Sequence, residues 1–418
     1  MTPDLVAAPT ARQRPWRLLV IVPWSPDLAL PKGAHMLGFS RGDLLTALLL
    51  TTTVLAACAG PAGPQASSQK KLVTVTDVVG REVQVRLPAD KVILQSTGTG
   101  GAFLTLFALE QKNVVSKIAG WDNGLTINRK DMYDNWVEAV PALASLPDVG
   151  STESNTLNIE KIITLKPDVM IITKSSQAAS KDAVDKLAAA GIPTVVIDYH
   201  SETLENYTKG IQLIGQIIGQ EQKARGLSEY FTAQFEKVTS RLATVNKQKP
   251  TVYVELGQDP AVYGNTYGDT FWGPLVENAG GINIAKGKVT GSTPLQPEYV
   301  IGTNPDVVLF GGSYWPDRPD SVKLGYTANP DTAVQFLIPF TRRPGWDSMS
   351  AVKNGRVHAA NHGLPRDVWA FYPMQYLAKI FYPETFKDLD PDAAFREFHQ
   401  KFLPVEPSGV WTLDLKKS

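Results

Sequence analysis

The sequence LNIEKIITLKPDVMII at residues 157–172 aligns without a gap with LQPEYVIGTNPDVVLF at residues 295–310. In both copies a Pro-Asp pair separates a segment of helical pattern from a run of apolar residues. Because proline disfavours helical backbone in the residue before it, each pair should end a short helix and start a buried strand. The repeat therefore predicts two lobes with duplicated architecture.

Segments that read as strands alternate with segments that read as helices on either side of this repeat. Alternating β-branched and polar residues at 73–87 predict a hairpin. A strand at 91–95 then leads through the glycine-containing loop 96–101 into a helix at 102–109. Strands that alternate with helices predict an α/β fold with parallel sheets. Further strands are expected at 117–120, 169–173, 194–198, 249–255, 307–310 and 356–359, and a further helix at 181–190.

A long helical pattern without proline joins the two series of strands. It covers residues 202–245, and its last part, 221–245, would be about 37 Å long at 1.5 Å per residue. That length suits a rod between two lobes better than a crossover helix within one sheet. We therefore predict an N-terminal α/β lobe at 73–219, a connecting helix at 220–247 and a C-terminal α/β lobe at 248–418.

The chain's only cysteine, Cys58, stands at the end of an apolar run. Arg41 precedes that run at 44–54, and the sequence LAAC at 55–58 ends it. A basic residue, an apolar segment too short to span a membrane and small residues before a cleavage point are the layout of a secretory signal peptide. LAAC also resembles the bacterial lipobox, which implies that Cys58 becomes a lipid-modified mature N-terminus. The alternative is a buried cysteine on a core helix.

The N-terminal residues are therefore predicted to be a leader at 1–57 and a flexible tether at 58–72. Residues before Met36 fit no signal-peptide layout in front of a second complete one, so we hypothesise that translation starts at Met36. The leader predicts a lipid-anchored, extracytoplasmic protein.

Composition argues against several classes of protein. The 41 basic and 41 acidic side chains give a net charge of zero, without a basic block suited to nucleic acid. One cysteine permits neither an intramolecular disulfide nor a cysteine metal cluster. No resident metal or cofactor is predicted, because the histidines outside the leader are too scattered in sequence to indicate a metal cage. These are His200, His358, His362 and His399.

The glycine loop leaves a cofactor-dependent enzyme as an alternative. Its sequence GTGGAF at 98–103 lies where a dinucleotide-binding fingerprint would lie, but Phe103 takes the place of the third glycine. No nucleophile elbow, phosphate loop or paired catalytic residues support catalysis, and an export signal disfavours a cytoplasmic cofactor. A surface scaffold or adhesin is a further alternative, which predicts no ligand cleft.

Five segments, in this order and spacing, resemble the class III periplasmic binding proteins of ABC importers, which receive ferric siderophores, cobalamin and haem. The resemblance covers about residues 73–404. It implies two Rossmann-like lobes joined by one long helix, a ligand cleft between them and no catalysis. It also implies a monomer that delivers its ligand to an ABC permease dimer with ATPase subunits. The segments are DVVGREV at 77–83, NIEKIITLKPDV at 158–169, AAAGIPTV at 188–195, FWGPLVENAGGINIA at 271–285 and WDSMSAVKNGRVH at 346–358.

Glu160 and Glu298 occupy equivalent positions in the repeat, in the first turn of each predicted helix. In one interpretation each carboxylate complements a helix dipole, an effect of about 0.3–1 kcal/mol at an exposed N-terminus. Two carboxylates in symmetric positions also suit a partner with two-fold symmetry. The resemblance implies this second role, because both residues match the family's lobe-tip glutamates, which dock against arginines of the permease.

In open α/β sheets, ligands bind beyond the carboxyl ends of the strands. Aromatic residues and an arginine occupy the loops that this rule selects, although core packing, or a surface ion pair of Arg366 with Asp367, would equally account for them. A guanidinium binds carboxylate or hydroxamate oxygens in a planar fork. Together with the resemblance this predicts a ferric siderophore-type metal chelate, with a corrinoid, haem, a free metal or an oxyanion as alternatives. The candidate ligand-binding residues are Trp121, Tyr263, His362, Arg366, Trp369 and Tyr372.

Overall fold

The computed structural model describes residues 70–415 of the 418-residue chain. The predicted leader, Cys58 and most of the predicted tether lie outside these residues. Within 70–415, no helix is both long enough and apolar enough to cross a membrane. Strand β1 begins at Lys71, so the last two residues of the stretch predicted as tether belong to a strand.

Residues 71–218, which we call the N-lobe, contain a four-stranded parallel sheet in the order β4-β3-β5-β6. The predicted hairpin is confirmed as a separate antiparallel pair of β1 with β2. The strands are β1 (Lys71–Thr76), β2 (Glu82–Leu87), β3 (Val92–Leu94), β4 (Ile118–Trp121), β5 (Val169–Thr173) and β6 (Thr194–Ile197). The α-helices are α1 (Phe103–Glu110), α2 (Gly124–Asn128), α3 (Lys130–Ala139), α4 (Ile159–Leu165), α5 (Lys174–Ala179), α6 (Lys181–Ala189) and α7 (Leu204–Ile218).

Residues 251–415, the C-lobe, contain a five-stranded sheet in the order β13-β12-β11-β7-β9. All its pairings are parallel except that of β13 with β12. The predicted α/β class with parallel sheets is therefore confirmed. The strands are β7 (Thr251–Leu256), β8 (Thr266–Tyr267), β9 (Ile282–Asn283), β10 (Ser292–Thr293), β11 (Val307–Gly312), β12 (Val357–Asn361) and β13 (Thr412–Leu415). The α-helices are α9 (Trp272–Asn278), α10 (Pro297–Thr303), α11 (Pro330–Leu337), α12 (Ser350–Lys353), α13 (Phe371–Phe381) and α14 (Pro391–Phe402).

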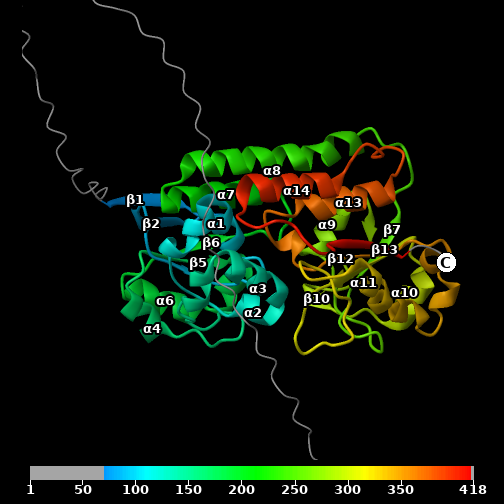
Figure 1. Cartoon of the computed structure of the whole chain (residues 1–418), viewed down its shortest axis with the longest axis horizontal. Coiled ribbons are helices and arrows are strands. Elements are labelled where there is room, and N and C mark those ends of the chain that lie inside the picture. Colours follow the sequence, from blue (N-terminus) through cyan, green and yellow to red (C-terminus); the bar gives the residue numbers. More distant parts are fainter. Residues whose placement is uncertain (1–69, 416–418) are drawn as a thin grey trace, which may run out of the picture. The chain divides into compact units, whose positions relative to one another are not determined.

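One long helix, α8 (Glu221–Leu242), separates the two lobes in the sequence. Gly219, with φ of 73°, ends α7 in the left-handed conformation that favours glycine, and the chain turns there into α8. Figure 1 shows α8 running beside α7 of the N-lobe and beside α13 and α14 of the C-lobe. The hydroxyl of Tyr230 in α8 donates to the carbonyl of Ala394 in α14 at 2.8 Å. The connecting helix thus packs on elements of both lobes.

The repeated segments have the same local structure in both lobes. Helices α4 and α10 each end at a residue in the left-handed region, Lys166 with φ of 50° and Asn304 with φ of 49°. The Pro-Asp pair follows, and β5 or β11 starts directly after it. Asp168 and Asp306 then accept backbone N–H bonds, at 3.1 and 2.8 Å, where the neighbouring strand begins. The predicted helix-turn-strand unit is confirmed in both lobes, and its aspartates join adjacent strands.

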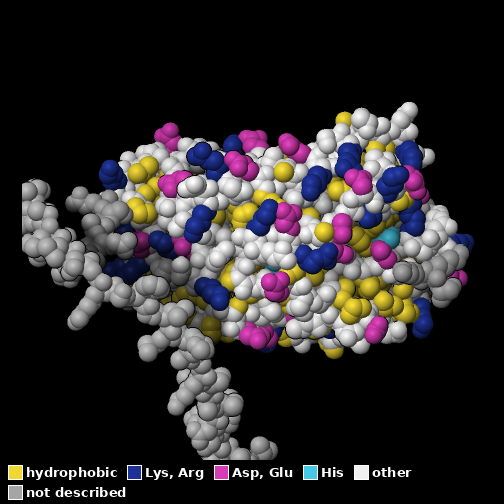
Figure 2. Space-filling view, turned by 45° about the horizontal axis from the view of Figure 1, so that its top comes forward, with side chains coloured by type: hydrophobic (Ala, Val, Ile, Leu, Met, Phe, Trp, Pro, Cys, Tyr) yellow, Lys and Arg dark blue, Asp and Glu magenta, His cyan; other side chains and the backbone are white. Residues whose placement is uncertain are grey.

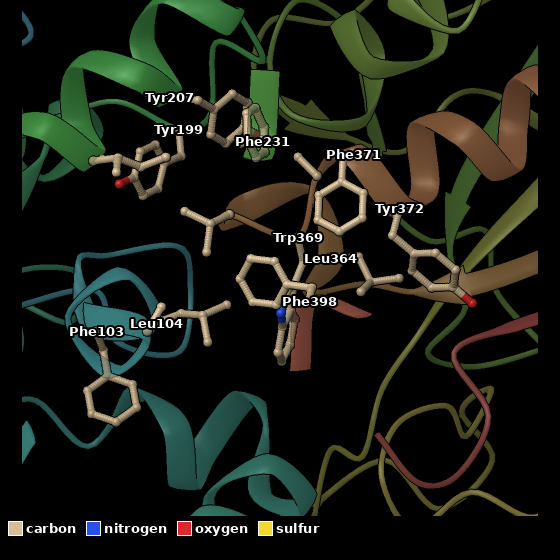
Figure 3. Close-up of a cluster of buried hydrophobic side chains, with 14 of the residues drawn as sticks. Phe103, Leu104, Tyr199, Tyr207, Phe231, Leu364, Trp369, Phe371, Tyr372 and Phe398 are labelled. Carbon is tan, nitrogen blue, oxygen red and sulfur yellow. The ribbon is translucent and has the colours of Figure 1, made fainter. Parts of the chain in front are cut away.

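A continuous hydrophobic core contains side chains of both lobes. It includes Leu94 of the N-lobe sheet, Leu309 of the C-lobe sheet and Trp369, which is fully buried. Figure 3 shows Trp369 among aromatic and aliphatic side chains that come from α1, α8, α13 and α14. Its ring lies 6.2 Å from that of Trp136 in α3 and 5.4 Å from that of Trp411 before β13, between centroids. Because apolar burial is continuous across the lobes, separating them would expose this core to water.

Candidate functional site

A cavity of about 140 Å³ lies between the lobes. Its N-lobe wall comes from the glycine loop after β3 and from the chain at the end of α2, and its C-lobe wall comes mainly from segments that follow β7, β11 and β12. The cavity therefore lies beyond the carboxyl ends of parallel strands, where ligands bind in sheets of this kind. The lining residues are Gly98, Asn128, Arg129, Leu256, Gln258, Tyr267, Ser313, Trp315, His362, Gly363 and Arg366.

The glycine loop packs closely against the C-lobe at this cavity. Gly100 has φ of 103°, and a Cβ there would lie 2.5 Å from the carbonyl oxygen of Arg366. The same Cβ would lie 2.9 Å from Nε2 of His200. Glycine at this position therefore allows the two lobes to approach. This packing role accounts for the GTGG sequence without a dinucleotide.

Arg366 is the cationic group at the cavity whose side chain is least paired. Its guanidinium lies over the ring of Phe271, 4.2 Å from the centroid. Its Nη2 lies 2.8 Å from Nε2 of His362. Its enclosed Nε has no hydrogen-bond acceptor among residues 70–415. Burial lowers the pKa of Arg366, an effect that a bound anion would offset.

His362 lies beside Arg366 and is buried. Its Nδ1 accepts a hydrogen bond from Nε1 of Trp272 at 3.1 Å, and its Nε2 lies 3.2 Å from the hydroxyl of Tyr267. Burial, and then the positive charges of Arg366 and Arg129, hold the pKa of His362 well below its usual value. The imidazole is therefore neutral at pH 7.

A second arginine, Arg129, forms a buried ion pair with Asp367 across the lobes. Arg129 also donates to the carbonyl of Gly363 at 3.2 Å. The alternative of a surface ion pair between Arg366 and Asp367 is wrong, because Asp367 is buried and has Arg129 as its partner. Arg129 is thereby neutralised, which leaves Arg366 as the cavity's uncompensated cation.

The structure brings two of the six candidate ligand residues, His362 and Arg366, to this cavity and places the other four elsewhere. Trp121 packs against Phe103, with ring centroids 5.3 Å apart, and lines a different cavity within the N-lobe. The hydroxyl of Tyr263 accepts a hydrogen bond from Trp346 at 2.7 Å.

Trp369 and Tyr372 belong to the aromatic core (Figure 3). The ring of Tyr372 stacks on Phe395 at 4.5 Å between centroids, and its hydroxyl donates to Asp392 at 2.6 Å. Both rings thus occupy packed positions in the core, although Nε1 of Trp369 has no hydrogen-bond acceptor among residues 70–415.

Sequence reasoning missed several residues at or beside the cavity, among them Arg129, Tyr267 and Trp272. Arg129 follows a five-residue helix, and no local pattern distinguishes it from a surface arginine. Trp272 was part of a segment quoted for the family resemblance, but its indole contact with His362 joins residues 90 positions apart. Trp315 and Gln258, by contrast, follow the ends of β11 and β7, where the strand-end rule directs attention.

Glu160 and Glu298 hold the same helical position, the second residue of α4 and of α10. Both side chains are exposed. Within residues 70–415 neither carboxylate takes part in an ion pair or a side-chain hydrogen bond. Both are thus available to a partner outside the chain.

Neither metal binding nor nucleic-acid binding finds support in the described part of the chain. Among residues 70–415, no group of three or more His, Cys, Asp or Glu side chains is placed to hold a metal ion. Figure 2 shows lysines and arginines interspersed with acidic side chains over the visible face. On that face, the mixture lacks the basic stripe of a phosphate-backbone binder.

Residues 108–361 match the periplasmic binding protein family. The chain is 42% identical to a solved structure, the TroA-like periplasmic binding protein FepB from Veillonella parvula, with a TM-score of 0.78. That match covers 82% of this chain and 100% of the other. An uncharacterised ABC transporter substrate-binding lipoprotein, YvrC of Bacillus subtilis, is 26% identical over 83% of this chain and 99% of its own length. The molybdate-binding protein MolA of Haemophilus influenzae is 25% identical over 78% and 90%.

The chain belongs to the periplasmic binding protein family. It is a substrate-binding protein of an ABC transporter, and it is not an enzyme. Proteins of this kind work with a permease and an ATPase. The predicted family and the predicted absence of catalysis are confirmed.

Proposed function

We propose that this chain captures a small oxyanion in the cavity between its lobes and delivers it to an ABC permease. The observation that carries the proposal is Arg366, whose guanidinium faces a cavity of about 140 Å³ without a paired carboxylate. No Asp or Glu lines that cavity. A charged, partly enclosed donor without an acceptor favours an anion in its place. The name of the relative MolA, a molybdate-binding protein, agrees with this ligand class.

The size of the cavity argues against the ferric siderophore-type chelate that the sequence predicted. Pockets for drug-sized ligands measure about 300–1,000 Å³, and siderophore chelates, corrinoids and haem are of that size or larger. A cavity of about 140 Å³ fits a compact anion and not those ligands. The aromatic residues expected to form a wide cleft are also packed elsewhere. We therefore favour the oxyanion among the alternatives.

Calorimetric titration of the purified protein distinguishes these ligand classes. The probes are molybdate, sulfate and hydrogen phosphate on one side, and ferric hydroxamates, cobalamin and haem on the other. Micromolar or tighter binding of at least one oxyanion, with no chelate binding at the same concentration, is the expected result. Tight binding of a chelate without binding of any oxyanion would overturn the proposed ligand but not the transport role.

The proposed docking residues are Glu160 and Glu298, for which the support is their matched position, exposure and lack of partners. Glu160→Arg with Glu298→Arg should abolish uptake in reconstituted vesicles and leave ligand affinity within about twofold. Complementary rim charges act mainly on association and orientation. The matched control reverses two exposed glutamates of α8, Glu229 and Glu236, and should transport normally. Normal uptake by the docking variant would refute this role.

The proposed anchor is Cys58, which lies outside the described residues. Its support is the LAAC sequence and the relative YvrC, which is named a lipoprotein. Since one acyl chain gives only marginal membrane binding, two or more on the cysteine are needed to hold the protein at the membrane. Cys58→Ala should move the protein from the membrane fraction to the soluble fraction. Retention of a processed Cys58→Ala protein at the membrane would exclude the anchor.

A further inference from the structure

His362 faces nitrogen donors on both sides of its ring. Nε1 of Trp272 lies 3.1 Å from Nδ1, and Nη2 of Arg366 lies 2.8 Å from Nε2. Indole and guanidinium nitrogens only donate hydrogen bonds. A neutral imidazole carries one hydrogen, so it can accept from only one of these two neighbours. One of the contacts must therefore place two N–H groups against each other.

The burial of Trp272 and the position of Arg366 at the cavity decide which of the two N–H groups His362 accepts. Trp272 is fully buried, and its Nε1–H has no other acceptor among residues 70–415. Arg366 stands at the cavity wall, where a ligand or water can accept its hydrogens. Because an unsatisfied buried donor costs about 1–3 kcal/mol, the bond from Trp272 is kept. The proton of His362 then lies on Nε2, which donates to the hydroxyl of Tyr267 at 3.2 Å.

Because Tyr267 then accepts from His362, its own hydroxyl hydrogen is not given to the imidazole and can point to the cavity that Tyr267 lines. The guanidinium of Arg366 is another donor there, and the lining residues Trp315 and Gly98 also carry N–H groups. Within residues 70–415, neither the Trp315 nor the Gly98 N–H has a hydrogen-bond acceptor. A ligand between these groups must therefore present oxygen acceptors. A hydroxyl hydrogen on the ligand would meet another donor.

We propose that Trp272, acting through His362 as a positioning residue, makes the cavity select oxyanions without a hydroxyl hydrogen over those that carry one. The preferred class includes molybdate and sulfate, and the disfavoured class includes hydrogen phosphate. This inference rests on the proposed oxyanion function. A site rejects a ligand that leaves buried polar groups unpaired. Asn128, Gln258 and Ser313 also line the cavity, and their side-chain oxygens can accept hydrogen bonds, which limits the preference.

Competition calorimetry of the purified protein with molybdate and hydrogen phosphate tests the selectivity. The wild type should prefer molybdate by roughly tenfold or more, the range for one unsatisfied polar group. Trp272→Phe frees Nδ1 to take the proton, so Nε2 can accept the hydroxyl hydrogen of Tyr267, which the cavity then loses as a donor. The preference should therefore fall by roughly tenfold. Trp346→Phe, another fully buried indole whose Nε1 bonds to Tyr263, is the matched control and should keep the ratio. An unchanged ratio in Trp272→Phe would overturn the inference.

The tautomer itself is measurable in the unmodified sequence, so the inference does not depend on folding of the variant. In ¹⁵N-histidine-labelled protein, the signals of His362 are assigned by their loss in His362→Gln. A protonated Nε2 with an unprotonated Nδ1 is expected, and a protonated Nδ1 would contradict the inference even if oxyanions bind. If no oxyanion binds, the proposed function fails and the selectivity fails with it. Equal binding of molybdate and hydrogen phosphate defeats the selectivity alone.

Discussion

The segment from His362 to Tyr372 divides into two regions with opposite environments. Its first half places His362 and Arg366 at the cavity, where Arg366 keeps a guanidinium nitrogen without an acceptor. Its second half places Trp369 and Tyr372 in the aromatic core, where rings stack on rings from both lobes. One short stretch thus supplies the candidate ligand contacts and part of the packing that holds the lobes together. The first half of the segment lines the cavity, whereas the rings of the second half pack in the core.

Two histidines repeat this contrast. His399 stacks on Trp369 with 5.3 Å between centroids, and both its ring nitrogens have compatible partners, the carbonyl of Phe395 and the hydroxyl of Tyr326. His362 is also buried and has Trp272 and Tyr267 as compatible partners, but Nη2 of Arg366 lies against its Nε2 as well. Burial alone therefore does not distinguish a structural histidine from one at a site. What sets His362 apart is its place at the cavity beside the guanidinium of Arg366.

Removing the ring of Trp369 from the core should lower the free energy of unfolding more than any other substitution proposed below. Trp369→Ala leaves a cavity among the packed rings and should lower the free energy of unfolding by about 3–5 kcal/mol. Urea denaturation followed by circular dichroism measures this loss. The folded fraction should still bind oxyanion, because Trp369 does not line the cavity. Loss of binding in fully folded protein would mean that the two regions are not separable.

Arg366→Ala should have the opposite effect: ligand affinity should fall while stability is kept. It removes a charged hydrogen-bond donor from the ligand, at a cost of about 1.5–3 kcal/mol in binding. The melting temperature should stay constant or rise, since an uncompensated buried cation is removed. Arg366→Lys should recover only part of the affinity, because lysine lacks the planar fork. A fall in melting temperature with unchanged affinity would assign Arg366 to the core instead.

The pH dependence of stability sharpens the comparison between histidines. Burial lowers the pKa of His399 to about 4, below its ordinary 6.5. Between those values the unfolded chain binds more protons, so the free energy of unfolding falls as pH falls. One such group contributes up to about 1.4 kcal/mol per pH unit. Comparing wild type with His399→Gln by denaturation at pH 7, 6 and 5 should show a shallower slope in the variant. The buried acids Asp122 and Asp131, with pKa raised to about 6, act in the opposite sense in both proteins.

Tyr372→Phe should give the smallest change in the free energy of unfolding. It keeps the ring stacked on Phe395 and removes only the hydroxyl that bonds to Asp392. A net loss of about 1 kcal/mol in the free energy of unfolding is expected, typical of one hydrogen bond. Oxyanion affinity should match the wild type in calorimetry. A tenfold loss of affinity would return Tyr372 to the ligand site.

Local patterns in the sequence predicted much of the architecture. The gapless repeat at 157–172 and 295–310 predicted two equivalent helix-turn-strand units, because a Pro-Asp turn acts on the residues next to it. The same alignment placed Glu160 and Glu298 in matched positions. Alternation of strands and helices predicted the parallel sheets. Each of these features depends on neighbours within a few residues, which a sequence displays directly.

The identity of the cavity residues was decided only by the tertiary structure. His362 and Arg366 were predicted from the strand-end rule, but the same rule selected aromatic residues that the fold buries elsewhere. Arg129 pairs with Asp367 across 238 positions, and Trp272 reaches His362 across 90. The sequence by itself determined the family, the lobes and the strand ends at which a ligand would bind. Long-range packing between the lobes decides which arginine keeps a free donor. Asp367 neutralises Arg129 from a distant position in the chain, whereas Nε of Arg366 has no acceptor among residues 70–415.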